Sequence, residues 1–171
     1  AMINRLKLNL NLFWQGAVLS YIALFRWLRP QPYIATKVWG PLTYMVFFVL
    51  LGRYASGRQS TSFYVIGNAL QTVAFSGIYG VTMSVGGDRE EGTLAYLFGS
   101  PANRFLLFSG RSILHILDGM LGAVIGFTWG VLILGLDLSN ANLLLMALII
   151  LIASFSTSGM GMLMGCLSLV T

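Results

Sequence analysis

Three ionisable side chains, Arg111, His115 and Asp118, are spaced so that they share one face of a helix. In a membrane protein, such a group near the bilayer midplane can relay protons. Asp118 and Asp137 are separated by about 28 Å of helix, close to the thickness of the hydrocarbon layer. That separation places the group near one interface. We therefore expect a structural ion pair with a hydrogen-bonded histidine, not a proton relay.

The sequence offers little for covalent, metal or nucleotide chemistry. It contains no Gly-Lys-Ser or Gly-Lys-Thr tripeptide, so it lacks a P-loop. The one cysteine, Cys166, lies in an apolar run, where we expect it to pack, and no metal-binding motif occurs. We expect no catalytic residue, no metal site and no cofactor in this chain.

A polar stripe lies within an otherwise apolar segment. Asn68, Thr72 and Ser76 recur every four residues, with Gln71 beside them. Polar groups in hydrocarbon need partners, so this stripe should face protein or water. Two interpretations stay open: the stripe lines a transport path, or it forms hydrogen bonds between helices.

Two glycine series have the spacing of close helix contacts. Gly122, Gly126 and Gly130 form one series, and Gly161 and Gly165 form the other. We expect packing within the subunit, with a dimer seam as the alternative.

Composition places the chain in a membrane. Of its 171 residues 57% are hydrophobic and only 9% are charged, with a mean hydropathy of +0.81, whereas soluble domains carry about 25% charged residues. The net charge of +5 fits basic residues at a membrane surface better than it fits nucleic-acid binding. We therefore expect an all-α integral membrane protein with no nucleic-acid partner.

The elements follow from the apolar runs and the helix breakers. Residues 4–29 have a basic polar stripe opposite aromatic residues, which predicts an amphipathic helix in the membrane interface, with a tilted extra span as the alternative. Pro30 and Pro32 end this helix. At least four transmembrane helices should follow, at about 34–54, 62–86, 112–136 and 143–165.

Charge distribution sets the orientation. With the N-terminus in the cytoplasm, eight basic residues are cytoplasmic and two are outside, and this bias is typical of membrane proteins. The cytoplasmic set is Arg5, Lys7, Arg26, Arg29, Lys37, Arg89, Arg104 and Arg111, and the outside pair is Arg53 and Arg58.

The segment between the second and third spans, called here the 88–104 connection, is compact and polar. Gly92 allows a sharp turn, and Thr93 can cap a short helix that ends near Gly99 and Pro101. On that helix Leu94, Leu97 and Phe98 share one face. A short helix with an apolar face, held at the membrane between two spans, is suited to docking into a partner.

The run Arg89-Glu90-Glu91-Gly92-Thr93-Leu94, followed by Leu97 and Ser100-Pro101, resembles the cytoplasmic coupling-helix segment of type 2 ABC exporter permeases. The order of elements is similar too, from an interfacial helix to a coupling helix between spans two and three. Many members carry an acidic residue after the Thr-Leu pair, where this chain has Ala95.

The resemblance implies an ATP-driven membrane permease that works with a cytosolic ABC ATPase dimer and a second permease subunit, surrounded by membrane lipid. ATP and Mg would be bound by the ATPase. Thr93, Leu94, Leu97 and Phe98 would contact it, and Arg89, Glu90 and Glu91 would brace the helix. The family has six spans, which implies two more beyond residue 171, and it exports drugs, peptides, lipids or lipid-linked glycans across a bacterial or archaeal plasma membrane.

Two other classes stay open. A non-transporting membrane anchor or regulatory subunit would bind no ATPase through the 88–104 connection. A proton-coupled secondary transporter would work without ATP, and the lack of an acidic residue near the bilayer midplane argues against it.

Overall fold

The structure is a computed structural model that describes residues 2–27, 29–56, 61–101 and 103–170. These residues form helices and connections, with no strand among them. The helices are α1 (Met2–Trp27), α2 (Pro30–Ser56), α3 (Thr61–Phe75), the π-helix η1 (Ser76–Gly80), α4 (Val81–Glu90), α5 (Leu94–Gly99), α6 (Arg104–Leu134) and α7 (Leu143–Val170). Arg58 lies outside the described residues, as do the side chains of Arg5 and Arg26.

Three of the helices are long and apolar enough to cross a membrane: Pro30–Ala55, Arg104–Leu134 and Leu143–Leu169. They cover the first, third and fourth predicted spans. The second predicted span is divided among α3, η1 and α4, none of which is long enough alone. The helix continues to Glu90, four residues beyond the predicted end of this span at residue 86.

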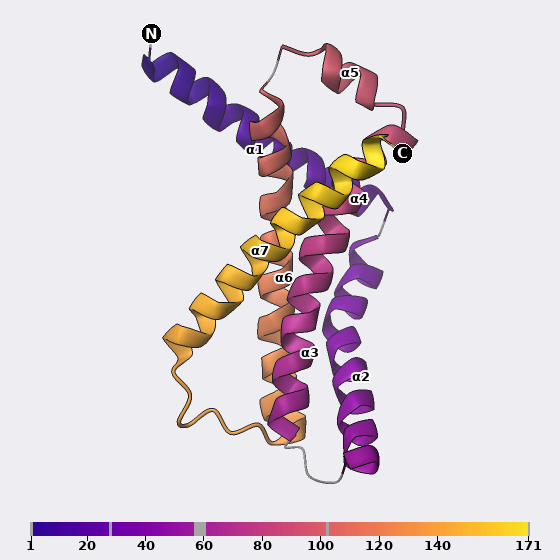
Figure 1. Cartoon of the computed structure of the whole chain (residues 1–171), viewed down its shortest axis with the longest axis vertical. Helices are drawn as coiled ribbons and strands as arrows, with labels where there is room; N and C mark the ends of the chain where they lie inside the picture. The colour runs from indigo at the N-terminus through magenta and orange to yellow at the C-terminus, as the bar shows by residue number, and fades with distance from the viewer. Residues whose placement is uncertain (1, 28, 57–60, 102, 171) are drawn as a thin grey trace.

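Figure 1 shows how these helices are arranged. α2, α3 and α6 run side by side along the long axis, and α7 crosses them at an angle. α1 crosses the upper end of α6, and α5 lies beyond that same end. α2 begins at Pro30, where a proline suits the first turn of a helix because its missing N–H needs no partner there.

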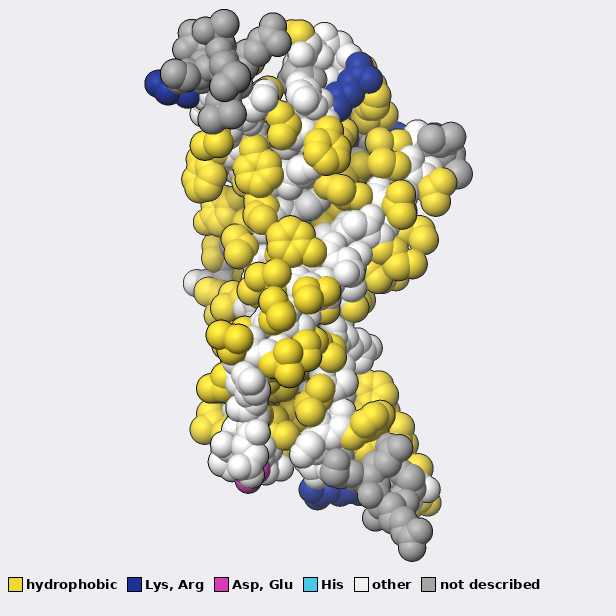
Figure 2. Space-filling model, turned by 60° about the vertical axis from the view of Figure 1, so that its left-hand side comes forward, with side chains coloured by type: hydrophobic (Ala, Val, Ile, Leu, Met, Phe, Trp, Pro, Cys, Tyr) yellow, Lys and Arg dark blue, Asp and Glu magenta, His cyan; other side chains and the backbone are white. Residues whose placement is uncertain are grey.

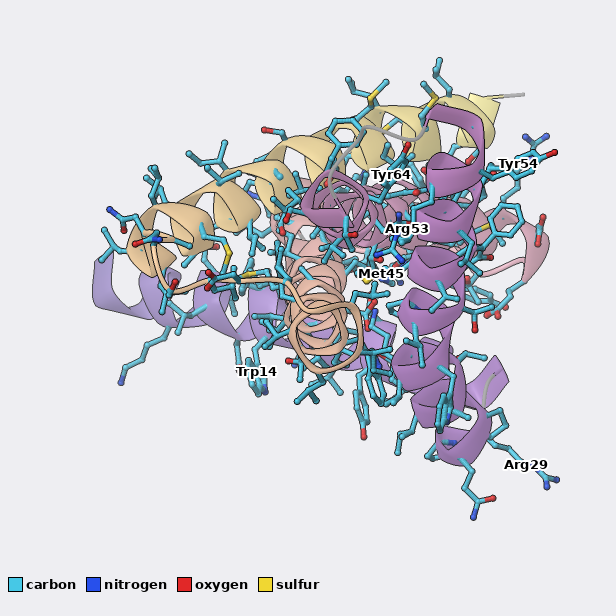
Figure 3. The ribbon with its side chains drawn as sticks, turned by 90° about the horizontal axis from the view of Figure 1, so that it is seen from below. Trp14, Arg29, Met45, Arg53, Tyr54 and Tyr64 are labelled. Carbon is cyan, nitrogen blue, oxygen red and sulfur yellow. The ribbon has the colours of Figure 1, made fainter. Side chains whose placement is uncertain are left out.

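The core of the bundle lies where α2, α3, α6 and α7 meet. Met45, Val65, Ala69 and Phe127 are buried there, and Met45 points from α2 into the bundle in Figure 3. Trp14 and Tyr54 point away from the bundle in the same view and are exposed. Figure 2 shows hydrophobic side chains over most of one face, with Lys and Arg near its two ends. An apolar surface of this kind suits contact with lipid rather than water.

Both glycine series pack within the subunit, as the spacing predicted. A Cβ at Gly122 would meet Thr72, and one at Gly130 would meet Val65, so α6 approaches α3 closely. Gly161 lies against the backbone of η1, and Gly165 lies against Val85. Small residues at these positions let the helix backbones come together without a clash.

Candidate functional site

The 88–104 connection leaves the bundle through a tight turn. α4 ends at Glu90, and Gly92 adopts a φ of +69°, a conformation that residues with a Cβ adopt only at a cost. α5 follows, and the chain is extended at Ser100. The side-chain oxygen of Asn103 then accepts hydrogen bonds from the Phe105 and Leu106 backbone amides, which caps the start of α6. The connection is thus anchored at both ends.

Thr93 stands at the start of α5 but does not cap it, so that part of the prediction is wrong. Its hydroxyl lies 3.1 Å from Asp88 Oδ1 and 3.2 Å from the Asp88 carbonyl oxygen, donating back to the end of α4. The Thr93 backbone amide also donates to the Asp88 carbonyl, at 2.9 Å. Gly99 is the last residue of α5, as the sequence predicted, and it has no positive φ, so α5 ends without a left-handed glycine cap.

The predicted apolar face of α5 turns partly back towards the bundle. Leu94 and Leu97 are half-buried, and Leu97 and Phe98 enclose a cavity of about 30 Å³ with Leu107 and Phe108 of α6. Phe98 is still 44% exposed. The outermost large side chain of α5 is Tyr96, at 82% exposure. Sequence reasoning missed Tyr96, although an aromatic residue off the apolar face of so short a helix was a usable signal.

The three predicted bracing charges differ in their surroundings. Arg89 Nη1 donates to the Ser168 carbonyl oxygen of α7 at 3.1 Å. Glu90 and Glu91 are exposed and have no side-chain partner among the described residues. The tightest ionic contact at this end is instead the buried pair between Asp88 and Arg111 Nη1, and the same nitrogen donates to the Ser84 carbonyl oxygen at 2.9 Å.

A second polar cluster joins α2, η1 and α6. The carboxylate of Asp118 accepts hydrogen bonds from the Tyr33 hydroxyl, from Lys37 Nζ at 2.5 Å and from Ser76 Oγ at 2.6 Å. Arg111 and Asp118 share a helix face, but they do not form an ion pair with each other. Each forms a structural ion pair with another helix, because their side chains lean towards different neighbours.

His115 lies between these two clusters and is buried. A Cβ at Gly80 would run into its imidazole ring, so the ring fills the space that this glycine of η1 leaves open. The His115 carbonyl oxygen accepts a hydrogen bond from Ser76 Oγ at 3.1 Å. A π-bulge inside a helix often marks a functional position, and here it brings Ser76 to the carboxylate of Asp118.

The polar stripe runs from α3 into η1, and its last two members, Thr72 and Ser76, contact α6. Asn68 Nδ2 donates to the Tyr64 carbonyl oxygen, Thr72 Oγ1 donates to the Asn68 carbonyl oxygen, and Ser76 joins the Asp118 cluster. Asn68 and Ser76 are buried. Gln71 alone of the four is exposed. Among the described residues, Asn68 and Thr72 therefore bond within α3, Ser76 alone of the four forms a hydrogen bond to another helix, and Gln71 is left accessible.

Comparisons with known proteins bear on this arrangement. The chain matches the family model described as ABC-2 type transporter over residues 15–169. No curated protein and no solved structure matches it. The matched region runs from α1 to the end of α7, so it includes both polar clusters and the 88–104 connection. The chain therefore belongs to the ABC-2 type transporter family and is an integral membrane permease of the type 2 ABC class.

Proposed function

We propose that this chain is the permease subunit of an ATP-driven exporter, and that the 88–104 connection couples it to a cytosolic ABC ATPase. One observation carries the proposal: α5 stands outside the bundle, beyond the end of α4 and α6, and presents Tyr96 to the surroundings. Membership of the ABC-2 family supplies the class of partner. The direction of transport follows from the resemblance of residues 89–101 to exporter permeases.

The order of the helices supports four membrane crossings. α3, η1 and α4 follow one another without a break and together run from the lower end of the bundle to the upper end in Figure 1. With α2, α6 and α7 they make four passes, and the connections alternate between the two ends. The 88–104 connection and α1 then lie on the same side of the membrane.

Charge supports a cytoplasmic location for that side. Lys7 lies in α1, Arg29 directly precedes α2, and Arg89 and Arg104 belong to the 88–104 connection, whereas Arg53 lies near the far end of α2. Basic residues favour the cytoplasmic face, so the N-terminus is cytoplasmic in this proposal. α1, which packs on the upper end of α6, takes the interfacial position predicted for residues 4–29.

The contact with the ATPase centres on α5. Tyr96 is the most exposed large side chain of α5, and a shallow hollow on the same segment is lined by Arg89, Gly92, Leu94, Ala95 and Phe98. An exposed aromatic side chain suits an interface, because aromatic residues supply large contact areas. Leu97 and Phe98 contact α6, and Leu94 and Phe98 line the hollow.

Transport requires a second permease subunit in this proposal, and ATP and Mg are bound by the ATPase pair. Asn68, Thr72 and Ser76 are used inside the bundle, so the transport path runs along another surface of the subunit. Gln71 is the accessible polar residue of α3 and is our candidate for that surface. The passage then forms between two permease subunits.

The test is affinity purification of the native full-length protein from its own host in mild detergents. Mass spectrometry identifies the bound proteins, and ATP hydrolysis is measured on the purified material. Tyr96→Asp and Phe98→Asp should remove a co-purifying ATPase while the permease still inserts, because each places a charge in the apolar contact. Tyr54→Asp is the matched control, since Tyr54 is 93% exposed at the opposite end of the bundle.

A stoichiometric ATPase that is lost with the Tyr96 and Phe98 variants and kept with Tyr54→Asp would support the proposal. A pure permease without any ATPase in every detergent would overturn it. Retention of the ATPase by both α5 variants would overturn the coupling role of α5 alone.

A further inference from the structure

The carboxylate of Asp88 is shared between two parts of the molecule. One oxygen, Oδ2, pairs with Arg111 of α6. The other, Oδ1, lies 3.1 Å from the hydroxyl of Thr93, the residue that begins α5. The single carboxylate of Asp88 therefore links Thr93, at the start of α5, to Arg111 of α6.

Arg111 lies where three helices meet. Its Nη1 also binds the Ser84 carbonyl oxygen of α4, and the Ser84 hydroxyl lies 3.0 Å from the hydroxyl of Ser20 in α1. The preceding residue, Gly110, touches the backbone of α1 at Phe13, and a Cβ there would collide with it. α1, α4 and α6 are thus in contact around one guanidinium group.

This contact is also well shielded. The side chains of Arg111 and Asp88 are only 8% and 11% exposed. Arg111 Nε is buried and has no hydrogen-bond partner. Among the described residues, the Asp88 carboxylate is the only anionic partner of the Arg111 side chain. A shielded ion pair holds its geometry better than an exposed one, because water and salt screen it less.

The polar contact at the far end of α5, between Arg104 and Phe98, is weaker. Arg104 lies 4.4 Å from the ring centre of Phe98 and donates to the Phe98 carbonyl oxygen at 3.2 Å, but Arg104 is exposed. Exposed contacts of this kind contribute little to stability. α5 is therefore held at its start by the turn at Gly92 and by Asp88, and at its end by the contact of Leu97 and Phe98 with α6.

We propose that the Asp88–Arg111 pair is the joint that fixes the 88–104 connection to α6 and α1, so that a displacement of α5 moves these helices as one body. Asp88 and Arg111 are positioning residues: they touch neither the ATPase nor the transported substrate. The inference rests on the proposed function for the source of the displacement, but the rigidity of the joint is a property of the permease itself.

The test measures a distance within one chain. Spin labels are placed at Gly99→Cys in α5 and Leu121→Cys in α6, in a Cys166→Ser background. A Cβ at Gly99 meets nothing within 4 Å, and Leu121 is exposed, so both positions accept a label. The complex is studied in lipid nanodiscs with unlabelled chains in excess, without nucleotide and with ATP plus vanadate.

The joint is broken with the double variant Asp88→Asn/Arg111→Met. Asparagine keeps an acceptor for Thr93, and the two changes remove both charges together, so neither is left buried alone. Glu90→Gln/Glu91→Gln is the matched control in the same segment, because neither glutamate has a side-chain partner among the described residues. Lys37→Met/Asp118→Asn is the control for loss of a buried ion pair elsewhere on α6.

We expect one narrow distance distribution in the wild type, unchanged by ATP plus vanadate, and a clear broadening in the Asp88/Arg111 variant only. A distribution as narrow in that variant as in the wild type would overturn the joint, as would broadening in the Lys37/Asp118 control. The two proposals can be contradicted separately. If no ATPase is present, the proposed function is contradicted. The distances measured without nucleotide still test whether the Asp88–Arg111 pair fixes α5 to α6.

Discussion

Two ion pairs use the same helix, two turns apart, yet they connect different parts of the molecule. Asp118 of α6 pairs with Lys37 of α2 and also accepts from Tyr33 and Ser76, so every partner belongs to the bundle. Arg111 of α6 pairs with Asp88, whose other oxygen binds Thr93 of the 88–104 connection. The first pair closes the bundle on itself, and the second attaches an outlying element to it.

This difference predicts which of the two ion pairs can be replaced by uncharged side chains without loss of function. A buried ion pair often adds little net stability over apolar side chains of similar size, although losing one partner is costly. The pair inside the bundle should therefore be replaceable as a unit without loss of function. Replacing both Asp88 and Arg111 by uncharged side chains should change the free energy of unfolding little, but it should loosen the position of α5.

The largest effect is expected at the pair inside the bundle. Lys37→Met alone leaves the Asp118 carboxylate buried without its cation, so the free energy of unfolding should fall by about 3–5 kcal/mol. Lys37→Met/Asp118→Asn should recover most of that loss, because no charge stays buried alone: the amide oxygen of asparagine accepts from one of the Tyr33 and Ser76 hydroxyls, and its NH2 group donates to the other. Denaturant unfolding in detergent micelles measures both. Equal loss in the single and double variants would show that the pair does not act as a unit.

The next effect concerns the crossing of α1 and α6. Gly16 touches the backbone of Leu107, and Gly110 touches that of Phe13, so a methyl group at either position forces the helices apart. Gly16→Ala and Gly110→Ala should each lower the free energy of unfolding by about 1–3 kcal/mol.

Gly67→Ala is the control for that crossing, since a Cβ there meets nothing within 4 Å. It should be neutral or slightly stabilising, because alanine favours a helix over glycine by up to about 1 kcal/mol. Thermal unfolding of the three variants in one detergent compares them directly. Equal melting temperatures for all three would rule out a tight crossing.

The smallest effect is expected on the exposed carboxylates. Glu90→Gln and Glu91→Gln remove charges that have no partner in the part of the chain that the structure describes, so stability should change by less than about 0.5 kcal/mol. Any larger effect on ATPase retention than on stability would place these residues at the partner interface instead. Co-purification and thermal unfolding of the same samples separate the two results.

Much of the fold could be predicted from the sequence. The apolar runs located α2, α6 and α7, and the prolines at 30 and 32 located the break after α1. Glycine spacing predicted the close packing of α6 on α3. These signals are local or periodic, so a single sequence carries them.

The partners of charged side chains could not be predicted in the same way. Asp88 stood first in the charged cluster, but nothing in its neighbours indicated that it, rather than Glu90 or Glu91, would turn inward. That choice depends on where α6 lies, and Arg111 is 23 residues further along the chain. The π-bulge at Ser76–Gly80 could not be predicted either, because the sequence around it follows an ordinary helical pattern.

Photo-crosslinking from α5 in native membranes tests the central claim most directly. A benzoyl-phenylalanine at position 96, with one at position 54 as the control, is irradiated in the host, and adducts are identified by mass spectrometry. An ATPase of the ABC class joined to position 96 and not to position 54 is the predicted result. Adducts with lipid alone at position 96, with the ATPase expressed in the same cells, would contradict the claim that α5 is the coupling contact.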